Sequence, residues 1–168
     1  VTRQVQAWMA PSGGVDATTM PCWLLDRGPA RPAIYGLAPD PLAASDSTSP
    51  ARHPKVALHG SDVVVDPDAG AAPVSDADIK RLREPYAALA PALAGDPVEA
   101  ATCLYTMSPD EHFLVGTRRG CTRTHFAAGL SGHGFKLSPA LGDALVDLAL
   151  LGRTDLPVGF LSPGRFGP

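Results

Sequence analysis

Two short stretches of this chain carry residue types that could do chemistry. Cys103-Leu104-Tyr105-Thr106 places a thiol at the start of a strand-like run, and residues 129–136 read Gly-Leu-Ser-Gly-His-Gly-Phe-Lys. The second stretch predicts a glycine-rich turn between a strand and a helix. Such a turn presents backbone N–H groups beside the positive end of a helix, an arrangement that suits an electron-rich ligand. A plain connection that merely needs glycines is the alternative that the pattern leaves open.

Three established motifs do not fit these stretches. A dinucleotide fingerprint needs G-x-G-x-x-G, but Gly132-His133-Gly134 is followed by Phe-Lys-Leu. A hydrolase elbow needs G-x-S-x-G, and the chain has His133 where the second glycine belongs. Cys121 and His125 have a spacing that zinc accepts, but no second ligand pair is apparent, so we expect no metal. For Cys103 itself, the alternative to a chemical role is a small buried apolar residue.

Composition narrows the class of protein and its partners. The chain has 168 residues, of which 45% are hydrophobic and 18% charged, and this predicts a globular protein with a real core. A net charge of −3 gives no basic surface, so we expect neither nucleic acid nor membrane as a partner. No apolar run is long enough to cross a bilayer and no signal peptide is apparent, which predicts the cytoplasm. The first residue, Val1, predicts an interior start or a processed product.

Cysteine and lysine usage add two weaker indications. Three cysteines are too few and odd in number for a disulfide framework, which predicts reduced thiols. Only three lysines stand against eleven arginines, and Lys55 and Lys136 fall in turns that carry histidine or glycine. A lysine kept in such a chain indicates a need for a compact ammonium.

The elements that must position these residues alternate between strands and helices. Strands are expected at residues 4–9, 20–26, 33–37, 55–60, 102–107, 112–115 and 124–130, with an exposed loop at 38–54. Ser75 and Asp78 predict a capping box that opens a helix, which Pro85 should kink. Ser138 as N-cap, Pro139 as first residue and Gly152 beyond the end mark the last helix. The order predicts an α+β (mixed α/β) fold.

The two stretches also resemble a known family. Residues 103–113 and 127–136, with the spacing between them, are similar to the sarcosine oxidase and N-methyltryptophan oxidase family, FAD-dependent amine oxidases of the D-amino-acid-oxidase superfamily. Weaker agreement covers residues 3–8, 34–37, 55–59 and 160–163. The resemblance implies oxidation of the C–N bond of an N-methyl or cyclic amino acid to an imine, with release of H2O2. A stand-alone, flavin-free descendant that binds a small molecule or does non-redox chemistry is the alternative, so whether the chain acts as an enzyme stays open.

The resemblance also implies how the chain divides. The family's N-terminal glycine-rich fingerprint for FAD and its N-terminal arginine have no match here. Residues 1–100 then correspond to a portion of the substrate domain, a mixed β-sheet with flanking helices. Residues 101–168 correspond to the closing strands and helix of an incomplete FAD-binding domain. We therefore expect a need for an N-terminal FAD-binding segment or partner chain, with a small-molecule amine or amino acid as substrate.

Site roles follow from the same resemblance. Cys103 would carry FAD through a thioether, and Lys55 would assist the reaction with oxygen, because a fixed ammonium stabilises the negative charge that develops. We expect these two side chains to face one shared flavin-sized space, with nearby positive groups giving Cys103 thiolate character. Lys136 would bind the substrate carboxylate. The remaining residues are implied to line the substrate cavity (His59, Tyr105, His133) or to contact the cofactor (Gly132, His133, Gly134, Phe135).

Overall fold

The computed structural model describes residues 1–12, 15–29, 31–70 and 72–167, and these form two compact units. The first unit is Val1–Leu104 and the second is Tyr105–Pro168. The boundary lies four residues beyond the expected division at residue 100. Within the described ranges, no helix has the length and apolar character that crossing a bilayer requires. Strands and two α-helices alternate along the chain, which confirms the α+β class.

A five-stranded sheet forms the first unit, with strand order β2-β3-β4-β1-β5. The strands are β1 (Thr2–Met9), β2 (Trp23–Leu25), β3 (Ala33–Leu37), β4 (Lys55–His59) and β5 (Pro97–Tyr105). The pairs β2–β3, β3–β4 and β1–β4 are antiparallel. Their connections contain no crossover helix, and strands joined in this way pair antiparallel.

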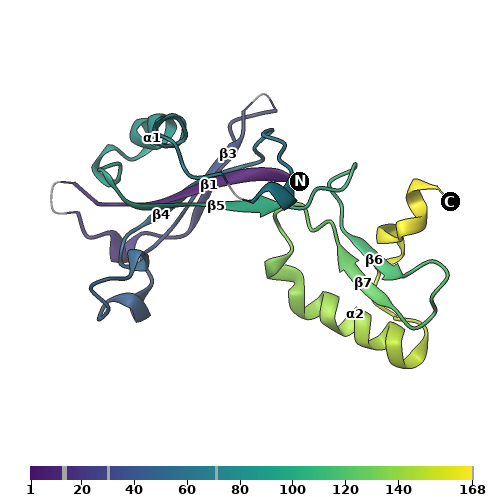
Figure 1. Ribbon diagram of the computed structural model, residues 1–168. Coiled ribbons are helices and arrows are strands. Elements are labelled where there is room, and N and C mark those ends of the chain that lie inside the picture. Colours follow the sequence, from purple (N-terminus) through teal and green to yellow (C-terminus); the bar gives the residue numbers. More distant parts are fainter. Residues whose placement is uncertain (13–14, 30, 71, 168) are drawn as a thin grey trace. The chain divides into compact units, whose positions relative to one another are not determined.

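Helix α1 (Asp76–Leu89) packs on one face of this sheet (Figure 1). Side chains alternate between the two faces of a strand, so the buried residues identify the face that α1 covers. That face carries the core of the unit, formed by Ala7, Met9, Ile34, Val56, Leu58, Leu82, Tyr86 and Ala94. On each strand, the side chains that alternate with these core residues point to the opposite face of the sheet. The helix continues through Pro85 to Leu89, so the proline does not end it.

The start of α1 is fixed to the sheet by a half-buried ion pair. The predicted capping box is confirmed: the side chains of Ser75 and Asp78 each accept a hydrogen bond from the other residue's backbone N–H. Arg3 of β1 donates to both carboxylate oxygens of Asp78, at 3.1 and 2.9 Å, and to the carbonyls of Ala72 and Pro73. These contacts hold the pKa of Asp78 well below its usual range. The pair therefore stabilises the unit while the carboxylate is charged.

Arg3→Met is expected to lower the free energy of unfolding by about 2 kcal/mol at pH 7, because it removes charged hydrogen bonds from Asp78. A carboxyl with a lowered folded-state pKa contributes stability that is complete above its unfolded pKa of about 3.9 and is lost as the pH falls below it. The difference between wild type and variant should thus shrink between pH 5 and about pH 2. Urea unfolding at a series of pH values measures it. An unchanged difference across that range would contradict the role given to Asp78.

The second unit is a two-stranded sheet packed against one helix (Figure 1). Strands β6 (Leu114–Thr117) and β7 (His125–Ala128) pair antiparallel, and α2 (Ser138–Leu151) lies against both. Buried side chains from β6, α2 and nearby turns form its core, namely Phe113, Val115, Leu141 and Leu161.

Two expectations for this unit are wrong in detail. Strand β6 starts at Leu114, so His112 and Phe113 lie in the preceding turn rather than in the strand. Ser138 makes no capping hydrogen bond, because a 3-10 turn at Phe135–Leu137 leads into the helix and Ser138 already has helical dihedral angles. Gly152 ends the helix in the left-handed conformation, as predicted.

Candidate functional site

Three of the implied site residues share the sheet face opposite α1. Lys55 and His59 alternate with Val56 and Leu58, whose side chains lie in the core. On β5, Ala100 packs against the same core, so strand alternation turns Cys103 to the other face. The first unit therefore brings an ammonium, an imidazole and a thiol to one side of one sheet.

The environment of Cys103 combines burial with a nearby positive charge. Lys55 lies on β4 directly across from Trp8 of β1, and its Nζ stands 5.7 Å from the centre of the Trp8 ring. Burial raises the pKa of the half-buried Cys103 thiol, and the Lys55 ammonium lowers it by a smaller amount. The net direction is upward, which is opposite to the thiolate character expected from the sequence. The Lys55 ammonium nevertheless favours the thiolate form of Cys103 electrostatically.

The glycine turn of the second unit is closely packed. Gly132 has φ of +79°, and a Cβ built on it would overlap the ring of Tyr105. A Cβ on Gly134 would come within 2.6 Å of the Leu130 side chain. Both positions thus require glycine for space, and Gly132 also for its conformation. The turn therefore packs Gly132 against Tyr105 and Gly134 against Leu130.

The backbone of this turn is less available to a ligand than the sequence suggested. The N–H groups of Ser131 and His133 are already used, because they donate to the carbonyls of Thr106 and Leu130, each at 3.0 Å. Phe135 is 94% exposed, and Lys136 is exposed beside it in the 3-10 turn. Lys136 is thus free to meet a carboxylate, while Phe135 contacts little in the second unit.

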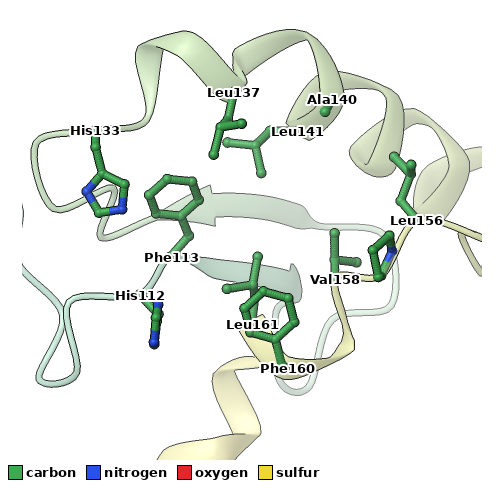
Figure 2. A pocket seen from close by; sticks show the side chains of 11 residues that line it. His112, Phe113, His133, Leu137, Ala140, Leu141, Leu156, Val158, Phe160 and Leu161 are labelled. Carbon is green, nitrogen blue, oxygen red and sulfur yellow. The ribbon is translucent and has the colours of Figure 1, made fainter.

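A cavity of about 320 Å³ lies beside the turn (Figure 2). It is lined by two imidazoles and otherwise by carbon: His112, Phe113, His133, Leu137, Ala140, Leu141, Leu156, Pro157, Val158, Phe160 and Leu161. The His133 and Phe113 rings stand side by side at its edge, with centres 4.7 Å apart. A lining of this kind suits an apolar group rather than a carboxylate.

Gly132→Ala is expected to lower the free energy of unfolding of the second unit by about 1–3 kcal/mol, because the new methyl group must displace the Tyr105 ring at a left-handed position. Gly142→Ala is the matched control. A Cβ at Gly142 meets open space in the middle of α2, so alanine there should stabilise the helix by about 0.5–1 kcal/mol. Denaturant unfolding followed by circular dichroism measures both changes. Equal effects of the two substitutions would contradict the close packing at Gly132.

The residues present fit a flavin in part. A half-buried thiol with an ammonium acting on it is present, while the net rise in the pKa of that thiol opposes the thiolate that covalent attachment would use. In the described part of the chain, no group of three or more histidine, cysteine or acidic side chains could hold a metal ion.

The family is established by comparison with known proteins. Residues 19–148 match the model of the FAD dependent oxidoreductase family, so the chain belongs to that family. It is 33% identical to the monomeric sarcosine oxidase of Streptomyces avermitilis, over 98% of this chain and 42% of that oxidase. It is 47% identical over 60 residues to the N-methyl-L-tryptophan oxidase of Salmonella enteritidis, over 36% of this chain and 16% of that protein. The chain thus spans about two fifths of the sarcosine oxidase's length.

Solved structures show the same fold. The L-proline dehydrogenase of P. horikoshii matches 98% of this chain and 39% of its own, with a TM-score of 0.73 and 20% identity. NikD, an amino acid oxidase of nikkomycin biosynthesis, matches 96% of this chain and 41% of its own, with a TM-score of 0.63 and 22% identity. At these identities the likeness concerns the fold alone.

The implied site residues thus fall into one group in each unit. Lys55, His59 and Cys103 share a sheet face of the first unit. The second unit holds the others, with Gly132 packed against the Tyr105 ring, His133 and Gly134 following in the same turn, and the exposed Phe135 and Lys136 next in sequence. Sequence reasoning missed the cavity, because Phe160 and Leu161 join Phe113 only in three dimensions. The apolar run at 156–161, after the end of α2, is the signal that could have indicated it.

Proposed function

We propose that this chain is the substrate-side portion of a FAD-dependent amine oxidase. The complete enzyme oxidises the C–N bond of an N-methyl or cyclic amino acid to an imine and releases H2O2. The chain works with a segment, covalently joined or separate, that supplies the dinucleotide-binding half. Membership of the family and 33% identity to a sarcosine oxidase support this assignment. Its cytoplasmic location stays a prediction from the sequence.

The single observation that carries the proposal is the shared position of Lys55 and Cys103. Both lie on the sheet face opposite α1, and the ammonium lowers the pKa of the thiol against the effect of burial. In a flavin-dependent oxidase the same pair has two distinct tasks, to hold the cofactor and to stabilise negative charge beside it.

Each side chain then has a role that its chemistry supports. FAD, when bound, accepts two electrons from the substrate carbon and delivers them to oxygen. Cys103 anchors the cofactor, and Lys55 stabilises negative charge during the reaction with oxygen. Lys136 pairs with the substrate carboxylate as a point charge. His59, Tyr105 and His133 supply polar groups to the substrate cavity, and the turn from Gly132 to Phe135 contacts the cofactor.

One observation favours the alternative of a flavin-free binding protein. Burial raises the pKa of Cys103, and a protonated thiol is a poor nucleophile. In that alternative Cys103 stays an unmodified thiol, and replacing Cys103 or Lys55 leaves ligand binding unchanged. Replacing Cys103 or Lys55 therefore distinguishes the two functions: the oxidase needs both residues, and the binding protein needs neither.

A substrate panel tests the proposal. The chain is mixed with a separately produced dinucleotide-binding segment and FAD, and H2O2 release is measured with N-methyl amino acids, cyclic amino acids and the corresponding amines without a carboxylate. We expect release with the first two groups and much weaker release with the third. Lys136→Met should raise KM for the carboxylated substrates and leave KM for the other amines unchanged. Equal H2O2 release from amines with and without a carboxylate would contradict the role of Lys136.

A further inference from the structure

Hydrogen bonds that pass through both side chains and backbone groups connect the C-terminal turn of the second unit to the glycine turn. Arg165 lies at one end of this network, where it donates to Asp110 and to the His112 carbonyl. The Ser108 hydroxyl donates to the same carbonyl, and the Ser108 N–H donates to Ser131 Oγ. His133 lies at the other end, bonded to the Ser131 backbone carbonyl. Ser108 and Ser131 are 6% and 4% exposed, although both are polar. Buried hydroxyl groups that are fully bonded fix the geometry of the segments they join.

The Arg165 guanidinium binds the Asp110 carboxylate through two hydrogen bonds. Nε and Nη2 donate to the two carboxylate oxygens of Asp110, at 2.8 and 2.9 Å, and Nη2 also donates to the His112 carbonyl at 3.0 Å. Nη1 donates to the carbonyls of Leu161 and Ser162. The planar guanidinium thereby ties the C-terminal 3-10 turn to the turn at residues 108–112. A lysine could not make this set of contacts.

The serines carry this constraint to the glycine turn. Ser108 Oγ donates to the His112 carbonyl at 2.6 Å and lies 3.5 Å from Ser131 Oγ, while the Ser108 N–H donates to Ser131 Oγ at 3.4 Å. Ser131 Oγ donates to the Gly129 carbonyl at 3.0 Å. Ser131 and Glu111, with φ of 45° and 61°, are the non-glycine residues of the described chain with positive φ. Both lie in the turns that the network joins, and such strain persists only where surrounding contacts impose it.

His133 is the residue that this constraint orients. Its Nδ1 lies 2.9 Å from the Ser131 carbonyl oxygen, which can only accept, so Nδ1 carries the proton. In the neutral ring Nε2 is then a hydrogen-bond acceptor. The ring stands beside Phe113 at the edge of the cavity, with one nitrogen turned toward Phe113 and the other away (Figure 2).

We propose that Arg165, Asp110, Ser108 and Ser131 are positioning residues that hold His133 with Nδ1 protonated and Nε2 presented as an acceptor for an N–H or O–H group of a ligand. The identity of that donor rests on the proposed function, in which it is the N–H of the amine substrate. The positioning itself does not depend on it. The network thus reaches His133 from the C-terminal turn, a segment that contributes no implied site residue.

Nitrogen NMR of the histidine rings tests this inference on the chain without cofactor. Wild type should show His133 predominantly as the Nδ1–H tautomer when neutral. Arg165→Met and the milder Ser108→Ala should shift His133 toward the Nε2–H tautomer that an unrestrained imidazole favours. Arg165→Lys should not restore the wild-type tautomer of His133, because an ammonium cannot bond both Asp110 oxygens in the planar geometry of a guanidinium. Arg153→Met is the matched control, since Arg153 pairs only with the exposed Asp155 and should leave His133 unchanged.

The outcomes separate this inference from the proposed function. A wild-type tautomer in folded Arg165→Met and Ser108→Ala proteins would overturn the inference. If Arg165→Met does not fold, Ser108→Ala alone decides. A shifted tautomer in a chain that never oxidises an amine after reconstitution would uphold the positioning and overturn the oxidase. In a chain that does oxidise amines, the same variants should raise KM for the amine more than they lower kcat.

Discussion

The Cys103→Ala protein is expected to hold no covalently attached flavin after acid precipitation. Wild type, reconstituted with a dinucleotide-binding segment and FAD, is expected to stay yellow after the same treatment. The reason is that alanine removes the sulfur that would form the thioether, whereas the sheet around it stays intact. Cys103 is half-buried on β5, and the loss of one sulfur there changes the packing little. Intact mass and the absorbance of the acid precipitate measure the attached flavin.

The other two cysteines are matched controls for this prediction. Cys22 is exposed on the first unit, and Cys121 lies in the hairpin loop of the second. Cys22→Ala and Cys121→Ala should keep the acid-stable flavin. Attachment should also be faster at higher pH, because burial raises the pKa of Cys103 and the thiolate fraction below the pKa increases about tenfold per pH unit. Acid-stable flavin in the Cys103→Ala protein would contradict the anchor.

Lys55→Met is expected to slow the reaction of the reduced flavoprotein with oxygen by roughly 10²–10³-fold. The ammonium stabilises negative charge that develops only in this step, so the anaerobic reduction of the flavin by the amine should change much less. The substitution also removes a positive charge that lowers the pKa of Cys103, and flavin attachment should therefore be slower. Stopped-flow absorbance of the two half-reactions measures both rates.

Lys80→Met serves as the control for the loss of one ammonium. Lys80 is exposed on α1 and forms only a 3.9 Å pair with Glu84, so its removal should leave both half-reactions unchanged. If Lys55→Met slowed the amine half-reaction and the oxygen half-reaction equally, the role given to Lys55 would be wrong. A general disturbance of the sheet would have that effect.

Local signals in the sequence predicted the fold where short-range chemistry decides it. The capping box at Ser75 and Asp78 and the glycine at 152 are decided by hydrogen bonds and dihedral angles of neighbouring residues, and both are present. The cap at Ser138 failed because a preceding 3-10 turn, which no residue type marks, brings that serine into the helix. Strand β5 starts at Pro97, five residues earlier than expected, because its pairing with β1 extends it.

The sequence indicated candidate site residues, whose roles stay predictions, but it did not indicate their arrangement. Cys103 and the glycine turn stand out because a thiol and closely spaced glycines are uncommon and readable. The pKa direction of Cys103 was not predictable, since burial depends on the neighbours that the fold supplies. The sequence also gave no sign of the role of Arg165, because its partner Asp110 is 55 residues away in the chain and only the fold brings them together.

The absorption spectrum of the reconstituted chain under anaerobic conditions tests the central claim most directly. The chain, a dinucleotide-binding segment and FAD are combined, the free flavin is removed, and an N-methyl or cyclic amino acid is added without oxygen. We predict that the bound flavin loses its yellow absorbance on addition of the amino acid and regains it when oxygen is admitted. A chain that retains no flavin, or holds flavin that every such amine leaves oxidised, would contradict the assignment to amine oxidation.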